Sequence, residues 1–250
     1  MIFRQLFHRE SSTYSYLLGD DTTRQALLID PVLEKTQETL SLINQLGLTL
    51  ALAIDTHTHA DHITGLGALR DQTNCKTMMG IQTLADCVSA AFSDGDLIDI
   101  GDIHLEVIYS PGHTDDSYSF YAFKQGILFT GDTLLIRGTG RTDFQNGDAN
   151  AQYDSLFQRL LTLPEDTVVY PGHDYKGWTS STIKEEREHN PRLQLADKNT
   201  YVAFMTNLQL PSPTLMDIAV PAKPTESSQL NKSLLFCQLV LRSHSLFCCL

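Results

Sequence analysis

Three histidines and an aspartate lie within six residues of one another, at His57, His59, Asp61 and His62. They belong to the segment Thr-His-Thr-His-Ala-Asp-His at 56–62, directly after an apolar run. Imidazole and carboxylate groups gain little from packing together unless a cation lies between them, because each loses hydration on burial. The cluster therefore predicts a metal-binding site at the end of a buried strand.

The local conformation of this cluster follows from side-chain periodicity. In an extended chain His57 and His59 point to the same side, because successive side chains alternate. Asp61 and His62 are then expected in the first turn of the next helix, where Asp61 is suited to the N-cap position.

Three further polar side chains follow apolar, strand-like runs. His113 and His173 each come directly after a Pro-Gly pair, and Asp132 follows Gly131. A Pro-Gly turn ends a strand and exposes the next side chain at the edge of the sheet. These nitrogen and oxygen donors suit Zn(II), Fe(II) or Mn(II) and argue against copper thiolate or iron–sulfur chemistry.

The rest of the chain alternates segments that would position these side chains. Strands are predicted where aliphatic, β-branched and aromatic residues are bounded by turn residues, at 2–7, 14–18, 26–30, 48–54, 75–79, 97–100, 103–109, 117–123, 126–130 and 167–170. Helices are predicted where apolar residues recur at helical spacing, at 34–46, 63–70, 81–90, 150–162, 179–189 and 197–207. Two blocks of strands, each closed by helices, indicate an α+β fold built as a two-sheet sandwich with helices outside.

Composition narrows the classes of partner and the compartment. A formal net charge of -12 disfavours nucleic-acid and anionic-membrane partners, which require clustered Lys and Arg. Five cysteines without a C-x-x-C spacing indicate a reducing environment rather than a disulfide framework. Cytoplasmic localisation is expected, with the mitochondrial matrix as the address only if an upstream presequence is missing from this chain.

The C-terminal segment differs in composition from the preceding chain. We expect one domain over residues 1–222 and an atypical, poorly ordered tail over 223–250. The apolar run 233–241 is too short for a bilayer span, which needs roughly 20 residues, so no membrane anchor is predicted.

The order of these motifs resembles the metallo-β-lactamase superfamily, whose fold is an αββα sandwich with metals at the sheet edges. The segment 131–147, Gly-Asp-Thr-Leu-Leu-Ile-Arg-Gly-Thr-Gly-Arg-Thr-Asp-Phe-Gln-Asn-Gly, is similar to that of the persulfide dioxygenases, also called sulfur dioxygenases or ETHE1-like proteins. The segments 173–175 and 185–193 also match that family. The similarity covers about residues 2–222, and the chain departs from the family's usual ending at Lys223.

The resemblance implies one Fe(II) per chain, held by His57, His113 and Asp132, with Zn(II) as an adventitious or alternative metal. Two histidines and a carboxylate leave coordination positions open for dioxygen and a second ligand. The implied reaction converts glutathione persulfide, dioxygen and water to glutathione and sulfite. The metal acts as template and electron relay, so no separate protein nucleophile is required.

The resemblance implies that the remaining cluster residues hydrogen-bond the ligands and tune one iron. The related hydrolase glyoxalase II uses the same residues to complete a two-metal site. Spacing alone leaves both roles open for His59, Asp61, His62 and His173.

Tyr175 and Arg192 match positions that contact glutathione in the family, whose carboxylates an Arg or a Tyr hydroxyl can bind. Arg137 and Arg141 lie in the signature segment, where a structural salt bridge is at least as well supported as a ligand role. The other histidines are expected at the surface: His8, His104, His189 and His244.

Three functions therefore compete. The leading one is an iron dioxygenase of sulfide catabolism, and the second is a two-metal thioester hydrolase acting on S-acylglutathione. The third is a metal-binding protein without catalysis, whose tail mediates association. Small-molecule substrates are expected in the first two, and whether the chain is a monomer or a homodimer stays open.

Overall fold

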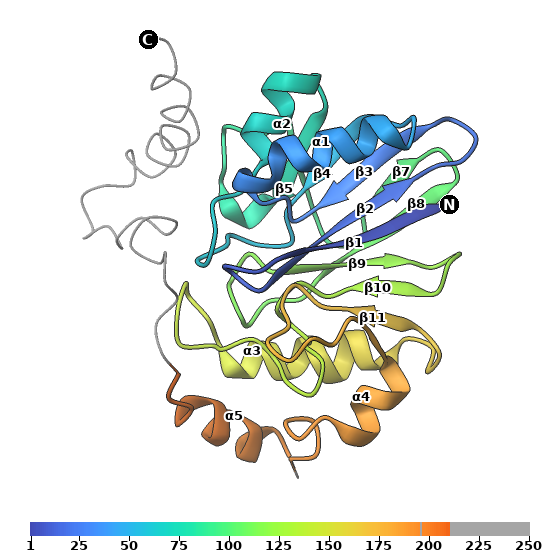
Figure 1. Cartoon of the computed structure of the whole chain (residues 1–250). Helices are drawn as coiled ribbons and strands as arrows, with labels where there is room; N and C mark the ends of the chain where they lie inside the picture. The colour runs from blue at the N-terminus through green and yellow to red at the C-terminus, as the bar shows by residue number, and fades with distance from the viewer. Residues whose placement is uncertain (196, 211–250) are drawn as a thin grey trace, which may run out of the picture.

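The computed structural model describes residues 1–195 and 197–210. Two six-stranded sheets pack face to face, and helices cover the outer face of each (Figure 1). The predicted αββα sandwich is therefore confirmed. The tail at 223–250 lies outside the described residues, as do 211–222 and His244.

The first sheet is formed by residues 2–92. Its strands, which pair in sequence order, are β1 (Ile2–His8), β2 (Thr13–Gly19), β3 (Gln25–Ile29), β4 (Thr49–Ile54), β5 (Lys76–Gly80) and β6 (Ala90–Phe92). β1 to β3 form the predicted antiparallel meander, and β3 to β6 are parallel. Helices α1 (Thr36–Gln45) and α2 (Leu66–Thr73) cover its outer face.

The second sheet is formed by residues 97–182. Its strands pair in the order β12-β11-β10-β9-β8-β7. In chain order they are β7 (Leu97–Ile100), β8 (Ile103–Tyr109), β9 (Tyr118–Ala122), β10 (Ile127–Phe129), β11 (Val168–Tyr170) and β12 (Ser181–Thr182). Its outer face is covered by α3 (Ala149–Asp154), α4 (Ile183–His189) and α5 (Lys198–Thr206).

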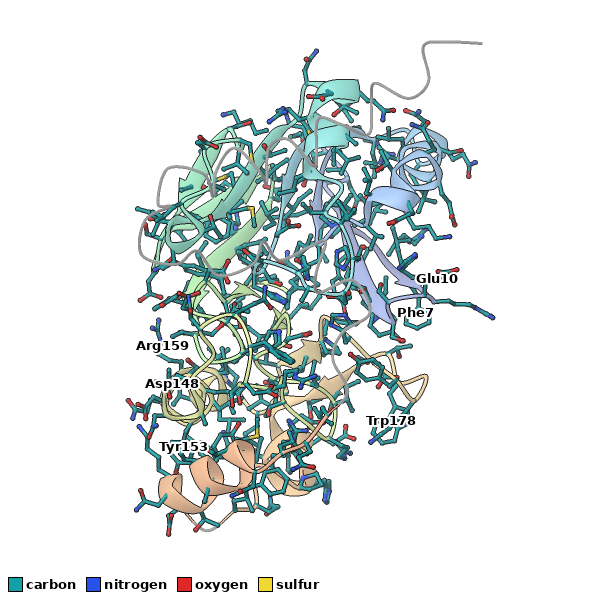
Figure 2. The ribbon with its side chains drawn as sticks, turned by 90° about the vertical axis from the view of Figure 1, so that its left-hand side faces the viewer. Phe7, Glu10, Asp148, Tyr153, Arg159 and Trp178 are labelled. Atoms are coloured by element: carbon teal, nitrogen blue, oxygen red, sulfur yellow. The ribbon has the colours of Figure 1, made fainter. Side chains whose placement is uncertain are left out.

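Local sequence explains where the helices of the second half begin. Asp148, labelled in Figure 2, caps α3, because its carboxylate accepts hydrogen bonds from the backbone N–H groups of Asn150 and Ala151. Helical structure continues from α3 through a π turn at Ser155–Arg159 and a 3-10 turn at Leu160–Thr162, so the helix expected at 150–162 is confirmed.

Three apolar layers hold the sandwich together. The largest lies between the sheets and contains the fully buried rings of Tyr16, Phe120 and Phe129. A second apolar layer fills the space between the first sheet and its helices. A third apolar layer fills the space between the second sheet and its helices. Within residues 1–195 and 197–210, no helix is long and apolar enough to cross a bilayer.

Two predicted helices are corrected by the structure. Residues 81–90 form a 3-10 turn at Ile81–Thr83 and then strand β6, because Leu84 takes a left-handed backbone conformation (φ 52°) that stops a helix. The helix expected at 63–70 begins only at Leu66, so Asp61 neither caps it nor enters it.

A carboxylate joins the ends of the two sheets. Asp20, after β2, accepts hydrogen bonds from the backbone N–H of Thr23 (2.6 Å), the Thr23 hydroxyl (2.7 Å) and the backbone N–H of Asp102 in the β7–β8 turn (3.1 Å). These donors lower the pKa of Asp20 to about 2.

Acid should therefore weaken the fold through Asp20. Because its folded pKa lies below its unfolded value of about 3.9, its contribution to stability is present above about pH 4 and is lost as the pH falls toward 2. Asp20→Asn should lower the urea midpoint at pH 6, and the gap from the wild type should shrink between pH 5 and pH 2.5. Asp102→Asn, which keeps the backbone N–H donor, is the control, and a gap that persists unchanged at pH 2.5 would contradict this prediction.

Candidate metal centre

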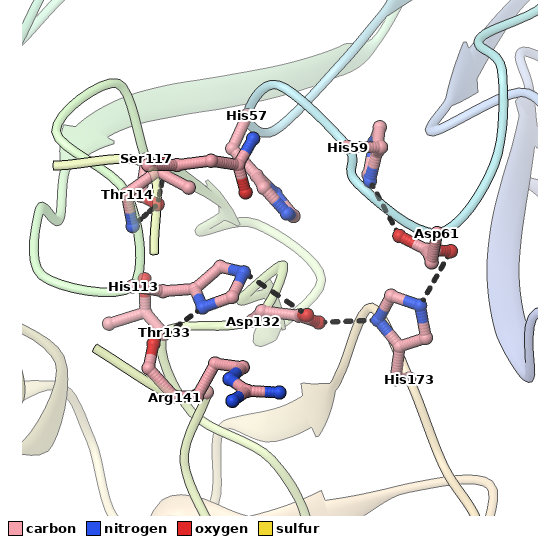
Figure 3. A network of polar contacts seen from close by, with 12 residues as sticks. His57, His59, Asp61, His113, Thr114, Ser117, Asp132, Thr133, Arg141 and His173 are labelled. Atoms are coloured by element: carbon pink, nitrogen blue, oxygen red, sulfur yellow. Dashed lines mark hydrogen bonds and ion pairs between the residues drawn. The ribbon is translucent and has the colours of Figure 1, made fainter. Parts of the chain in front are cut away.

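Strand ends from both sheets converge at one edge of the sandwich. His57 follows β4 of the first sheet, whereas His113, Asp132 and His173 follow β8, β10 and β11 of the second sheet (Figure 3). One ligand atom from each of His57, His113 and Asp132 lies within 4.8 Å of the other two. The structure thus brings together residues that are up to 75 positions apart in the chain (132 - 57 = 75).

Hydrogen bonds fix the tautomer of His57. The Thr56 hydroxyl donates to Asp30 Oδ2 (3.0 Å) and is therefore an acceptor for His57 Nδ1, at 2.9 Å. This leaves the proton of neutral His57 on Nδ1 and a lone pair on Nε2. Burial, reinforced by the charges of neighbouring histidines, lowers the pKa of His57 well below its usual value, which favours the neutral form that a metal needs.

The backbone sets the tautomer of His113 in the same way. Its Nδ1 lies 2.7 Å from the backbone carbonyl oxygen of Arg141, which can only accept, so Nδ1 carries the proton. The Nε2 lone pair then faces Asp132 Oδ2 at 3.5 Å. Two imidazole lone pairs and a carboxylate facing one another fit a bound metal ion, which would remove their mutual repulsion.

His173 orients Asp132, the third candidate ligand, and does not itself offer a lone pair to the metal. Its Nδ1 lies 2.7 Å from Asp132 Oδ1, and its Nε2 lies 3.0 Å from Asp61 Oδ2 (Figure 3). Burial alone would lower the pKa of His173, but the charges of Asp132 and Asp61 outweigh it and raise the pKa well above its usual value. With both nitrogens donating to carboxylates, this ring has no lone pair for a metal.

A second group of possible ligands lies beside the first. His59, Asp61 and His62 also have one ligand atom each within 4.8 Å of one another. Within the described part of the chain, the buried atoms His59 Nδ1 and His62 Nε2 have no hydrogen-bond partner. Unpaired buried nitrogens are costly, so these two atoms fit either a second cation or bound water.

A proton can also satisfy this second group. His59 Nε2 lies 3.2 Å from Asp30 Oδ1, and Asp55 is buried nearby. Burial alone would lower the pKa of His59, but Asp30, Asp55 and Asp61 outweigh it and raise the pKa to about 9. Protonated His59 would neutralise part of this carboxylate cluster.

Gly172 permits the close approach of strand ends that the site requires. A Cβ atom at this position would lie 2.7 Å from Asp132 Oδ1 and 3.0 Å from the backbone of Gly131. Any larger residue would therefore displace the carboxylate or the turn.

We expect Gly172→Ala to weaken metal binding by about 10–100-fold through displacement of Asp132, the range found for residues that orient ligands. Competition with a chromophoric chelator measures the affinity. Gly138→Ala is the matched control, because the nearest atom to its Cβ would be 4.0 Å away. Equal affinities of the two variants would show that Gly172 does not set the ligand position.

The residues matched to glutathione contacts lie at different depths. Tyr175 is 73% exposed, and its ring stacks on that of His173 with centroids 6.0 Å apart. Arg192 is partly buried, and its Nη1 donates to the Thr139 carbonyl (2.5 Å) and hydroxyl (2.9 Å). Arg192 thus already has a structural partner within the chain.

Both arginines of the signature segment form ion pairs. Arg137 pairs with Glu185 and Glu186, and Arg141 pairs with Asp143 through two hydrogen bonds of 2.7 and 2.8 Å. The salt-bridge interpretation of these residues is therefore confirmed.

Several contributors to the site carry no signal in the sequence motifs. Asp116 accepts from the Thr58 hydroxyl and the Thr114 hydroxyl, both at 2.5 Å, and so joins the loops that carry His57 and His113. The Arg141 carbonyl acts through backbone position alone. Such contacts depend on the meeting of distant loops, which local spacing does not encode.

The expectation that all unmatched histidines lie at the surface is wrong for His8, which is only 7% exposed. It is the last residue of strand β1. His189 is exposed and His104 is partly exposed, as expected.

Comparisons with known proteins identify the family of this chain. The family model of the metallo-beta-lactamase superfamily matches residues 8–85 and 88–173. "Persulfide dioxygenase ETHE1, mitochondrial" of Mus musculus is 48% identical over 227 residues, covering 89% of this chain and 87% of the relative. The human protein of the same name is 47% identical with the same coverage. The crystal structure of ETHE1 from Myxococcus xanthus superposes with a TM-score of 0.86 at 52% identity, covering 89% of this chain and 97% of that one. The chain therefore belongs to the metallo-β-lactamase superfamily and, within it, to the persulfide dioxygenase family.

Proposed function

We propose that the chain is an iron(II)-dependent dioxygenase that converts glutathione persulfide, dioxygen and water to glutathione and sulfite. The observation that carries the proposal is the inward-facing set of His57, His113 and Asp132 in a chain of this family. An open two-histidine, one-carboxylate set is typical of non-haem iron oxygenases. Family membership makes the chain an enzyme with a metal-binding site and a small-molecule substrate.

In this proposal one iron is held by Nε2 of His57, Nε2 of His113 and a carboxylate oxygen of Asp132. When bound, the metal supplies adjacent positions for the persulfide sulfur and dioxygen and carries electrons between them. The Thr56 hydroxyl and the Arg141 carbonyl keep both imidazoles in the ligating tautomer.

The other cluster residues support the ligands rather than bind a second ion. His173 orients Asp132 by a 2.7 Å hydrogen bond, and its other nitrogen is engaged by Asp61. Since His173 offers no lone pair in this arrangement, it does not complete a second site with His59, Asp61 and His62. Zinc would occupy the same three-ligand site as an alternative or adventitious metal.

Glutathione would lie beside Tyr175 and Arg192. The exposed Tyr175 hydroxyl is free to approach a carboxylate from the solvent side, while its ring rests on His173. A guanidinium has several N–H groups, so Arg192 can bind a second acceptor while Nη1 stays on Thr139.

Three further assignments stay predictions. They are a catalytic domain over 1–222 with a separate tail over 223–250, a cytoplasmic or mitochondrial-matrix address, and homodimer formation. The relatives named as mitochondrial favour a mitochondrial address if a presequence precedes this chain.

The alternative function is a two-metal hydrolase of S-acylglutathione. It is favoured by the unpartnered nitrogens His59 Nδ1 and His62 Nε2 and by the grouping of His59, Asp61 and His62, whose ligand atoms lie within 4.8 Å of one another and could hold a second metal. Two metals would then activate a water for attack on the thioester carbonyl.

Anaerobic purification, metal counting and substrate turnover separate the two functions. The dioxygenase proposal expects one iron per chain, oxygen uptake on addition of glutathione persulfide, and sulfite as product. Two metals per chain with thioester cleavage and no oxygen uptake would overturn it. Zinc recovered after aerobic handling would not separate the two functions, because zinc binds such ligands more tightly than ferrous iron.

A further inference from the structure

A turn at 174–178 leads from the metal centre to the surface. His173 contacts Asp132, and Tyr175, two residues further along the chain, stacks its ring on that of His173. Trp178, at the end of the turn, is 42% exposed and lies at the outer edge of the molecule in Figure 2. The turn therefore forms part of the surface next to the metal centre.

Hydrogen bonds hold this turn in one conformation. The buried Asp174 carboxylate accepts from the backbone N–H of Lys176 at 2.8 Å and from that of Trp178 at 2.7 Å. The Trp178 carbonyl accepts from the Tyr14 hydroxyl at 3.0 Å, which fastens the turn to strand β2 of the first sheet. Gly177 has a φ of 86°, a left-handed conformation that glycine adopts without strain. The backbone of the turn therefore fixes where Lys176 and Trp178 begin.

The Lys176 ammonium lies over the exposed indole ring. Its Nζ is 4.7 Å from the centroid of the Trp178 ring, within the range of a cation–π interaction. Within residues 1–195 and 197–210, Lys176 forms no ion pair with a carboxylate. An aromatic ring supports the positive charge without neutralising it, so the ammonium keeps N–H groups for an anion.

Other cations near the site are already engaged within the chain. Arg137 lies 5.9 Å from the Trp178 ring, but its charge is paired with two glutamates. Arg141 pairs with an aspartate, and the partly buried Arg192 donates to a carbonyl and a hydroxyl oxygen. Lys176 therefore offers an exposed positive charge that no described carboxylate cancels, in a chain whose net charge is -12.

The separation of this charge from the metal centre suits a tripeptide. Consecutive Cα atoms are about 3.8 Å apart, so the Cα atoms of His173 and Lys176 are at most about 11 Å apart. An extended tripeptide spans about 10 Å. Glutathione persulfide has its reacting sulfur on the central residue and a carboxylate on each of the other two. With the sulfur at the metal, a carboxylate can therefore come within reach of the long Lys176 side chain.

We propose that Lys176, supported by the Trp178 ring, binds a carboxylate of glutathione persulfide at the edge of the metal centre. This inference rests on the proposed dioxygenase function. The ring beneath the ammonium limits its motion, so the ion pair costs less side-chain entropy than one formed by a freely moving lysine. Neither side chain takes part in the oxidation, and their contribution is to substrate affinity.

The composition of the chain makes this binding visible. Because the chain has one tryptophan, all tryptophan emission arises from Trp178. S-methylglutathione added to the zinc-loaded protein should change this emission in a saturable way, since its carboxylate draws the ammonium from the ring. Lys176→Gln should raise the Kd by about two- to fivefold, the range for an exposed ion pair, and Lys176→Glu by about tenfold, because repulsion replaces attraction.

Matched variants and ligands separate this contact from the net charge of the protein. Lys176→Arg keeps the charge and should keep the affinity. Lys124→Glu is the control, because Lys124 is exposed in the turn after β9, at the other end of that strand from His113, and its replacement should leave the Kd unchanged. S-methylglutathione diethyl ester, which has no free carboxylate, should bind the wild type and Lys176→Gln equally.

Steady-state kinetics extend the test to turnover. In Lys176→Glu, KM for glutathione persulfide should rise by about tenfold while kcat stays at the wild-type value, because the contact is the same in the ground state and the transition state. Equal losses of affinity in Lys176→Glu and Lys124→Glu, or wild-type emission that does not respond to S-methylglutathione, would overturn the proposed contact.

The binding and oxygen-uptake measurements fail independently. Binding that depends on Lys176 but is accompanied by no oxygen uptake would keep the carboxylate contact and reject the dioxygenase function. Oxygen uptake together with wild-type affinity in Lys176→Glu would reject the contact and keep the function. A wild-type protein that does not bind S-methylglutathione would reject the contact whatever the activity.

Discussion

Replacing Asp132 with asparagine should reduce both bound iron and persulfide oxidation by at least about 100-fold, beyond the effect expected of a residue that only orients a ligand. The carboxylate supplies the negative charge of the three-ligand set, and its two oxygens face different partners. Oδ2 lies 3.5 Å from His113 Nε2, and Oδ1 accepts from His173. An amide at this position removes the charge and presents an NH₂ group to one of these neighbours.

Metal content per chain after anaerobic reconstitution, measured together with oxygen uptake, tests this expectation. Asp99→Asn is the matched control, since Asp99 is an exposed carboxylate that also pairs with a histidine, His104. An Asp132→Asn protein that binds one iron with wild-type affinity would remove Asp132 from the ligand set.

Replacing Glu186 with alanine should destabilise the protein by about 3–5 kcal/mol, the range for breaking a buried ion pair from one side. The Glu186 side chain is fully buried and accepts from Arg137, whose guanidinium and backbone N–H both contact it. It also accepts from Ser181 Oγ at 2.6 Å and Asn190 Nδ2 at 2.8 Å. Alanine would leave these donors without their acceptor in the interior.

The neighbouring residue provides the control for this experiment. Glu185 also pairs with Arg137, but its side chain is 45% exposed, so Glu185→Ala should cost less than about 1 kcal/mol. For a domain of this size, the Glu186 variant should melt about 10 °C below the wild type. Similar melting temperatures for the two variants would show that burial does not amplify the Glu186 interaction.

The candidate metal ligands could be found from the sequence because each follows a recognisable local pattern of residues. An apolar strand followed by Pro-Gly, or by a dense run of histidines, places a polar side chain at a sheet edge wherever the rest of the chain lies. This reasoning gives seven candidate residues, from which the family resemblance selects His57, His113 and Asp132, and the structure brings one ligand atom of each within 4.8 Å of the other two. The two-sheet architecture was predictable for the same reason, since most strands are marked by alternation and turn residues.

Features that depend on distant partners could not be predicted in this way. The pattern at 81–90 has helical spacing, yet the left-handed turn at Leu84 and pairing of Ala90–Phe92 with β5 prevail. His8 has no recognisable motif, and its burial follows from where β1 ends relative to Ser11 and Glu10. The Arg141 carbonyl, which fixes His113, is a backbone atom and leaves no trace in residue type.

The division of the sheets along the chain has a consequence for biogenesis. Residues 2–92 supply every strand of the first sheet and residues 97–182 every strand of the second, yet the three candidate ligands are shared between them. A ribosome-bound chain that ends before β10 holds His57 and His113 but lacks Asp132. The complete three-residue set can therefore form only after strand β10 has been synthesised and the two sheets have packed together.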